Sequence, residues 1–154
     1  MPAIAICEPT SPAEIEHARA IRRRVFVAEQ GIGEALEFDD RDDQARHLLA
    51  HVDGAPAGTL RIRLLEEGRV AKIERVAVLA AQRRHRVGRA LMVAALDVAR
   101  AQGAGEARVH AQTVVEPFYA GLGFVPVDAV FEEDGIAHIA MRLPLAPACG
   151  RAER

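Results

Sequence analysis

The sequence is poor in cysteine, in aromatic residues and in long apolar runs. Its two cysteines, Cys7 and Cys149, lie near opposite ends of the 154 residues, and neither belongs to a metal or redox motif. A disulfide framework is therefore disfavoured, which favours a reducing cytoplasm. No apolar run reaches the ~18–20 residues needed to span a bilayer, and no basic segment precedes an apolar one at the start. We expect neither a membrane span nor a signal peptide.

Charge and ring composition argue against a nucleic-acid partner. The formal net charge is −2, and the sequence has five Phe, one Tyr and no Trp. Binding of single-stranded nucleic acid depends on a basic surface with aromatic residues placed for stacking. Half of the residues are hydrophobic and 27% are charged, as is ordinary for a globular protein. We expect a single domain over 1–145, a disordered tail over 146–154, and no nucleic-acid or membrane partner.

Apolar periodicity and turn residues divide the chain into strands and helices. Ser11 and Glu14 form a capping box around Pro12 and so begin a helix over 12–29. A loop is expected over 31–45, followed by an antiparallel meander. The expected strands are 3–7, 47–52, 59–64, 70–78, 107–111, 124–131 and 136–143, and the further helices are 88–102 and a short one from Pro117. This order predicts an α+β fold, specifically an α/β sandwich.

The stretch most informative for function is the basic loop between a strand that ends at Val78 and a helix that starts near Gly88. Arg83, Arg84 and Arg86 lie in this loop. Backbone amides at a helix N-terminus bind anions, and arginine adds bidentate hydrogen bonds to phosphate. The loop therefore predicts a pyrophosphate site, with a solvated basic turn as the alternative.

A second motif, QTVVEPFYAGLGF, occupies residues 112–124. Together the two motifs resemble the phosphate loop and the Phe-Tyr-x-x-x-Gly-Phe element of the GNAT N-acetyltransferase superfamily. The segments 24–30 (RVFVAEQ), 110–112 (HAQ) and 133–141 (EDGIAHIAM) are similar to its ElaA/YjcF-like branch. The resemblance covers about residues 10–143. It implies a GNAT-like acyl-CoA N-acyltransferase fold, whose mixed, mostly antiparallel sheet is splayed and flanked by helices.

The resemblance also implies an activity. An acyltransferase of this kind moves the acetyl group of acetyl-CoA to a primary amine of a small molecule or peptide by direct attack, without a metal. The sheet would open between strands that end at Val78 and Ala111, and the Val78 N–H would polarise the thioester carbonyl as an oxyanion donor does. The cofactor-binding residues implied are Val76, Ala77, Val78, Arg83, Arg84, His85, Arg86, Val87, Gly88, Arg89, Ala90, Gln112, Phe118 and Tyr119.

Tyr119 is the expected acid. It matches the tyrosine of the family element and is the single tyrosine of the chain. Its hydroxyl would protonate the departing thiolate. The alternative is a core aromatic whose hydroxyl is hydrogen-bonded.

The expected base is Glu74, which shares a strand face with Val78. A base or a water chain is needed because an aliphatic amine has a pKa of about 10.4. The alternative for Glu74 is a rim carboxylate paired with Arg61 or Arg63. His110 is a second candidate base.

Residues of the family-like segments would wall the acceptor pocket: Arg24, Glu29, Gln30, His47, His110 and His138. By contrast, Arg22 and Arg23 are interpreted as the solvated face of the first helix. The acidic run over 37–43 lacks the spacing of a calcium loop and is interpreted as a solvated loop.

The chain departs from the family pattern in the phosphate loop. Arg86 replaces the first loop glycine, and its Cβ disfavours a positive φ and crowds the phosphate. We expect side-chain contacts to compensate, with weaker binding of the pyrophosphate. Gln112 replaces the commoner asparagine, and Pro117 shortens the small helix.

Two alternative functions stay open. One is acyl-homoserine-lactone synthesis, whose enzymes carry segments similar to 22–26 and 39–43. The other is a non-catalytic CoA-binding module, which the Arg86 departure favours. The expected protein is bacterial and cytoplasmic, and its oligomeric state, including a homodimer, is left open.

Overall fold

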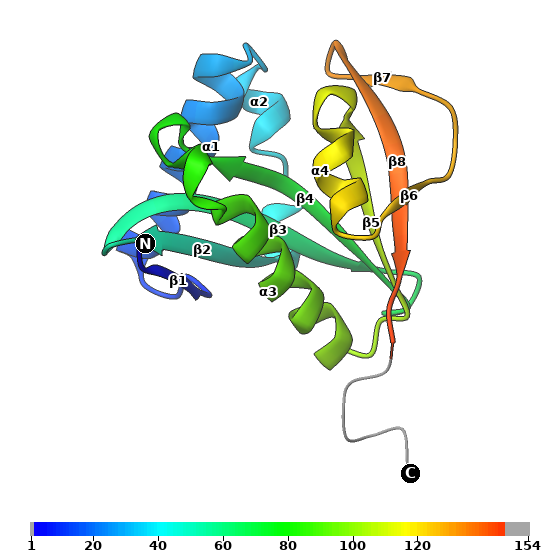
Figure 1. Ribbon diagram of the computed structural model, residues 1–154. Helices are drawn as coiled ribbons and strands as arrows, with labels where there is room; N and C mark the ends of the chain where they lie inside the picture. The colour runs from blue at the N-terminus through cyan, green and yellow to red at the C-terminus, as the bar shows by residue number, and fades with distance from the viewer. Residues whose placement is uncertain (1, 147–154) are drawn as a thin grey trace. The chain divides into compact units, whose positions relative to one another are not determined.

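The computed structural model describes residues 2–146 (Figure 1), so the expected tail over 146–154 lies outside the described residues beyond its first residue. The chain divides into two compact units, and the expected single domain over 1–145 stays a prediction. The first unit comprises Met1–Arg63 and Arg75–Ala95, and the second comprises Leu64–Glu74 and the chain from Leu96 onward. No helix within the described residues is long and apolar enough to cross a membrane.

The first unit holds the N-terminal strands and most of the helices. Its strands are β1 (Ile4–Cys7), β2 (Arg46–Val52), most of β3 (Ala55–Leu65) and the end of β4 (Val70–Val78). Its helices are α1 (Pro12–Arg22), the π-helix η1 (Arg23–Glu29), α2 (Glu34–Glu37), the 3₁₀-helices η2 (Asp42–Gln44) and η3 (Ala80–His85), and the first part of α3 (Val87–Ala101). β1 pairs antiparallel with β2, and β2 with β3.

The first helix begins as predicted. Ser11 Oγ accepts a hydrogen bond from the Glu14 N–H at 3.1 Å, and Glu14 Oε1 accepts from the Ser11 N–H at 3.3 Å. This capping box satisfies amides that a helix start leaves without partners. The helical region reaches Glu29, but only as the π-helix η1 after Arg22. The segment expected to be a loop, 31–45, instead contains α2 and η2.

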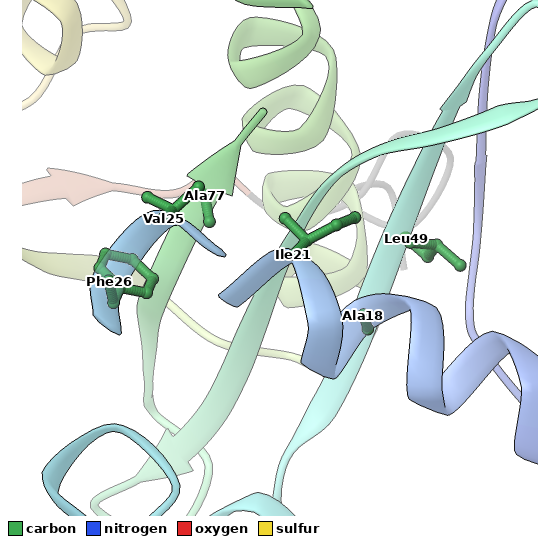
Figure 2. Close-up of a cluster of buried hydrophobic side chains, with 6 residues drawn as sticks. All are labelled: Ala18, Ile21, Val25, Phe26, Leu49 and Ala77. Atoms are coloured by element: carbon green, nitrogen blue, oxygen red, sulfur yellow. The ribbon is translucent and has the colours of Figure 1, made fainter. Parts of the chain in front are cut away.

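A cluster of buried apolar side chains joins α1 and η1 to two strands (Figure 2). Its members are Ala18 and Ile21 of α1, Val25 and Phe26 of η1, Leu49 of β2 and Ala77 of β4. Cys7, Ile32 and Leu79 pack against its edge. Burial of such side chains stabilises the fold by about 1.5–3 kcal/mol for each large residue. The cluster therefore fixes the end of β4, where the sequence predicts cofactor contacts.

Helix α3 approaches β3 closely at Gly58. A Cβ on this glycine would lie 3.0 Å from the Ala77 carbonyl oxygen, 3.0 Å from Leu91 Cδ1 and 3.1 Å from Val87 Cγ1. Both α3 residues are fully buried. The missing side chain thus allows the first turn of α3 to pack on the strands, which sets the position of the helix N-terminus.

The second unit is built around β5 and β8. It contains the start of β4, β5 (Glu106–Gln112), the 3₁₀-helix η4 (Thr113–Val115), α4 (Glu116–Gly121), β6 (Val125–Pro126), β7 (Phe131–Glu133) and β8 (Ile136–Pro144). β4 pairs with β5 in parallel, whereas β5, β6 and β7 all pair antiparallel with β8. Figure 1 shows α4 beside β5 and β8.

The fold class is confirmed, with one difference in the strands. Along the hydrogen bonds the strand order is β1-β2-β3-β4-β5-β8-β6, with β7 also on β8. The sheet is mixed and mostly antiparallel and helices flank it, as the α+β prediction requires. The strand expected over 124–131 is two short strands, β6 and β7, separated by residues 127–130.

Candidate active site

The end of β4 carries an unusual backbone conformation. Arg75 has a φ of 58° inside the strand. A left-handed residue with a Cβ costs about 1–2 kcal/mol, so the surrounding structure has to stabilise it. Beyond Arg75, the Ala77 side chain is buried, whereas Val76 and Val78 are partly buried. The strand then ends where the Leu79 N–H donates to the Ala57 carbonyl at 2.9 Å.

The predicted phosphate loop is the 3₁₀-helix η3 followed by a left-handed residue. Arg86 has φ 62° and ψ 30° and connects η3 to α3. The Cβ disfavours this region, and Arg86 adopts it nevertheless. The chain therefore adopts the backbone conformation that glycine would adopt here, directly before the fully buried Val87 of α3.

The N-terminus of α3 points backbone donors toward this loop. The first bond into the helix runs from the Ala90 N–H to the Arg86 carbonyl at 3.1 Å. The N–H groups of Val87, Gly88 and Arg89 precede it and have no acceptor within the helix. The helix dipole adds a partial positive charge at the same point, and both effects favour an anion.

Side chains of the loop differ in what they contact. Arg84, His85 and Arg86 are exposed, as is Arg89 in the first turn of α3. Arg83 is also exposed, but its guanidinium is engaged: Nε donates to the Val78 carbonyl at 2.9 Å, and Nη2 donates to Glu29 Oε1 at 2.9 Å. Those contacts tie the loop to β4 and η1. The remaining basic side chains, next to the helix start in the sequence, are solvent-exposed.

Two side chains that were expected from the sequence to be solvated, one on the first helix and one in the acidic run over 37–43, are in fact buried. Arg22 is 2% exposed rather than solvated, and Glu37 of the acidic run is also 2% exposed. Arg22 Nε donates to Glu37 Oε2 at 2.7 Å, and its Nη1 donates to Asp42 Oδ1 at 2.8 Å. A buried charge is tolerated when it is paired and hydrogen-bonded. This pairing explains why the side chains of Arg22 and Glu37 are both buried.

Two further arginines complete this charged cluster. Arg61, 1% exposed, donates from Nη1 to Asp39 Oδ1 and to Asp42 Oδ1, both at 2.8 Å. Arg75 Nε lies 3.1 Å from Glu37 Oε1, and its Nη2 lies 3.3 Å from Asp39 Oδ2. The segment that follows η1 is thereby fastened to α1, β3 and β4. It is not a solvated loop.

The carboxylates of this cluster do not share one electrostatic environment. Hydrogen bonds from the Arg61 guanidinium hold the pKa of Asp39 well below its usual range. Burial acts to raise the pKa of Asp42, but hydrogen bonds from Arg22 and Arg61 outweigh it and lower that pKa. Burial raises the pKa of Glu37 against the opposing effect of Arg22 and Arg75.

The predicted acceptor residues of the first unit lie on η1, at its end, and at the start of β2. Arg24 is exposed on η1, and Gln30 is the exposed residue that ends it. Glu29 receives the hydrogen bond from Arg83. His47 Nε2 lies 2.9 Å from the Asp42 carbonyl oxygen, so Nε2 carries the hydrogen of that bond.

In the second unit, Tyr119 lies on α4 and is 7% exposed. Its ring meets Phe118 and Phe124 edge to face, with centroids 5.0 Å and 5.8 Å away. Burial raises the pKa of Tyr119 to about 12. The buried, ring-packed side chain is compatible with a core aromatic as well as with the acid that the family element implies, so both interpretations of Tyr119 stay predictions.

The rings of His110 and His138 both contact the ring of Phe131. His110 Nδ1 is 3.2 Å from Glu133 Oε1, and its ring meets Phe131 edge to face at 5.1 Å. His138, 7% exposed, stacks on the Phe131 ring with centroids 5.9 Å apart, and its Nδ1 donates to the Ile136 carbonyl at 2.7 Å. The sequence motif contained Glu133 but gave it no role, because the β5–β8–β7 pairing that brings it to His110 is not visible in the sequence.

The other two predicted residues of this unit are Glu74, which forms an ion pair, and Gln112, which pairs with a residue of the neighbouring strand. Glu74 Oε2 lies 3.2 Å from Lys72 Nζ, so an ion pair occupies the expected base. Gln112, the last residue of β5, is opposite His138 of β8. No group of three or more His, Cys, Asp or Glu side chains in the described part of the chain is arranged to hold a metal ion.

A family model described as "Acetyltransferase (GNAT) domain" matches residues 13–145, which include most of each unit. The chain belongs to the GNAT acetyltransferase family. Members of this family are acyltransferases, and the predicted phosphate loop and Tyr119 element both fall inside the matched range.

Similar proteins place this GNAT acetyltransferase in the predicted ElaA/YjcF-like branch. It is 33% identical to ElaA of Escherichia coli over 124 residues, which are 79% of this chain and 81% of ElaA. It is 32% identical over 129 residues to the uncharacterized N-acetyltransferase YjcF of Bacillus subtilis, covering 83% of this chain and 91% of YjcF. An acyl-CoA N-acyltransferase structure from Pseudomonas aeruginosa matches with a TM-score of 0.78 at 31% identity, covering 91% of this chain and 98% of that one.

Proposed function

We propose that this GNAT acetyltransferase transfers the acetyl group of acetyl-CoA to a primary amine of a small molecule or peptide. The observation that supports it most directly is the start of α3. Exposed Arg84, Arg86 and Arg89 lie in the sequence next to or among residues 87–89, whose backbone N–H groups have no acceptor within the helix. A pyrophosphate needs this combination of backbone donors and charged donors. We therefore assign the cofactor phosphates to residues 83–90, and the pantetheine arm to Val76–Val78.

Acetyl-CoA would supply an acetyl group activated as a thioester. The acceptor nitrogen attacks the carbonyl carbon, a C–N bond forms, and the C–S bond breaks. The Val78 N–H is the proposed donor to the carbonyl oxygen as negative charge develops on it. Tyr119 retains its proton at neutral pH, because burial raises its pKa to about 12. We propose that its hydroxyl donates a hydrogen bond to the departing sulfur and completes the proton transfer there.

The proton released by the amine needs an acceptor, and the chain offers two. Glu74 would first have to leave its ion pair with Lys72 at 3.2 Å. His110 is better prepared: a carboxylate only accepts, so the contact with Glu133 at 3.2 Å makes Nδ1 the donor and leaves the Nε2 lone pair for a proton. We propose His110 as the base, directly or through water, with Glu74 as the alternative.

The proposed acceptor-binding residues are Arg24, Glu29, Gln30 and His47 in the first unit and His110 and His138 in the second. The acidic residues on which the lactone-synthase alternative rests are held by arginines, since Asp39 and Asp42 both accept from Arg61. That engagement favours amine acetylation over lactone synthesis. The cytoplasm remains the proposed compartment.

The test is a thiol-release screen with acetyl-CoA against amines, amino sugars, polyamines and peptide N-termini. Thiol release that depends on the amine, together with a mass increase of one acetyl group on the acceptor, supports the proposal. Turnover with an acyl-carrier protein but not with acetyl-CoA would favour lactone synthesis. Binding of CoA without thiol release across the whole panel would favour a non-catalytic CoA-binding module.

A further inference from the structure

Arg75 combines a left-handed backbone with a side chain that is held on several sides. Its φ is 58° inside β4, directly before the residues to which the proposed function assigns the pantetheine arm. A residue with a Cβ disfavours this conformation, whereas glycine adopts it freely. Any change in the φ of Arg75 would turn the amides of Val76–Val78 in a new direction.

The contacts of the side chain all go to the end of α2 and the residues next to it. Nη2 of Arg75 donates to the Leu36 carbonyl at 3.2 Å and to Asp39 Oδ2 at 3.3 Å. Nε lies 3.1 Å from Glu37 Oε1. These acceptors are themselves held in place, because Arg22 Nε donates to Glu37 Oε2 at 2.7 Å. The guanidinium is therefore bonded to a fixed partner rather than to a mobile surface.

We propose that Arg75 is a positioning residue whose guanidinium, held by Glu37 and Asp39, keeps β4 in the left-handed turn that directs the Val76–Val78 amides. Without these contacts, a residue with a Cβ at position 75 would relax toward the extended conformation of its neighbours. A glycine would not need them. The cofactor part of this inference rests on the proposed function, but the conformational part does not.

Two variants at the same position separate the role of the backbone from the loss of the ion pairs. Arg75→Ala and Arg75→Gly both remove the guanidinium, so Glu37 and Asp39 lose the same ion-pair partner in each variant. If the side chain serves to hold the turn, alanine should weaken binding of coenzyme A about tenfold relative to glycine, which corresponds to about 1.4 kcal/mol. Calorimetric titration with coenzyme A measures this difference. Equal affinities in the two variants would overturn the proposal.

Hydrogen exchange of the Val76–Val78 amides gives a readout that needs no ligand. Exchange should be faster in Arg75→Ala than in Arg75→Gly, and equal rates would also count against the proposal. If the wild type does not bind coenzyme A at all, the proposed function fails while this comparison still decides the role of Arg75. If Arg75→Gly folds and Arg75→Ala does not, a residue with a Cβ at this position needs the guanidinium contacts to adopt the left-handed turn. That outcome supports the proposal.

A third variant covers the case in which neither substitution folds. Asp39→Asn removes one carboxylate partner of Arg75, and the exposed Asp40→Asn is its matched control. Faster exchange at Val76–Val78 in Asp39→Asn alone would support the role of the ion pair. Identical exchange in the two variants would overturn it.

Discussion

The Arg83 guanidinium donates to the carbonyl oxygen of Val78 at 2.9 Å and thus joins the phosphate loop to the strand that precedes it. The second end of the same guanidinium is 2.9 Å from Glu29. Arg83 therefore differs from its neighbours Arg84 and Arg86, for whose side chains the described part of the chain provides no ion pair. Within this loop, Arg83 therefore has a structural role, whereas Arg84 and Arg86 are available to bind a ligand.

Reversing the charge of Arg84 should weaken acetyl-CoA binding with little effect on stability. Arg84→Glu is expected to raise the Michaelis constant by about ten- to a hundredfold, as the loss of a charged hydrogen bond of about 1.5–3 kcal/mol requires. Turnover at saturation should change less, because phosphate contacts are equal in the ground and transition states. Steady-state kinetics measure both parameters.

The matched control is Arg69→Glu, which makes the same charge change on a side chain that is 70% exposed in the second unit. It should leave the Michaelis constant unchanged. Arg83→Glu should instead lower the melting temperature, since it places a second carboxylate beside Glu29. An unchanged Michaelis constant in Arg84→Glu would mean that the loop is only a solvated turn.

At Arg86 the glycine variant should be more stable than the alanine variant, and at Arg84 the order should be reversed. Arg86 has a φ of 62°, so Arg86→Gly should be more stable than Arg86→Ala by about 1 kcal/mol. At Arg84, inside η3, alanine should be more stable than glycine by about 0.5–1 kcal/mol. Chemical denaturation of the four variants gives the free energies. The same ranking at both positions would contradict the left-handed conformation of Arg86.

Removal of the Tyr119 hydroxyl should slow the reaction without disturbing the fold. Tyr119→Phe keeps the ring contacts with Phe118 and Phe124 and deletes the hydroxyl alone. Turnover should fall by roughly 10²–10³, near the usual range for acid catalysis. The loss should shrink with an acyl donor whose thiol is more acidic. Unchanged turnover with a lowered melting temperature would make Tyr119 a structural residue.

The same tyrosine allows an optical test, because it is the single tyrosine of the chain. Absorbance of tyrosinate should rise with a midpoint near 12 in the folded protein, against about 10 for an exposed tyrosine. The raised pKa stabilises the fold below pH 10, and this contribution is lost as pH rises from about 10 to 12, because only the unfolded chain ionises there. Tyr119→Phe should remove that part of the alkaline loss of stability. A folded-state midpoint at 10 would mean that the hydroxyl is solvated.

The buried ion pair of Arg22 and Glu37 predicts an asymmetry between two glutamates of one short helix. Glu37→Gln should destabilise the fold by about 3 kcal/mol, since it leaves buried arginine charge without its carboxylate. The control is Glu34→Gln, also on α2, whose carboxylate is 62% exposed and 3.5 Å from Arg23. Its effect should stay below about 0.5 kcal/mol. Equal effects of the two substitutions would show that the charged cluster contributes nothing specific.

Local signals in the sequence were sufficient for the features that depend on neighbouring residues. The capping box of Ser11 and Glu14 joins residues three apart, and the structure confirms it. The loop before α3 is also local, since a basic turn followed by an amphipathic helix is visible in one short stretch. The resemblance of residues 112–124 to a family element rests on the same kind of contiguous pattern.

The features that the sequence did not predict depend on partners that are distant along the chain. Arg22 and Glu37 look like surface residues because each is charged, and only their pairing across 15 residues allows burial. The left-handed turn at Arg75 lies in a run of residues that reads as a regular strand, and its stabilising contacts reach back 36 to 39 residues. The approach of Glu133 to His110 likewise needs the pairing of two strands with β8.

The close approach at Gly58 limits how this protein can change. A methyl group there would meet a main-chain oxygen and two fully buried side chains at 3.0–3.1 Å, so no single neighbour could move aside to make room. A mutational library over β3 should therefore return glycine alone at this position. The exposed residues 84–86 should tolerate wide variation in selections for folding, and lose that tolerance only when the selection demands acetyl transfer.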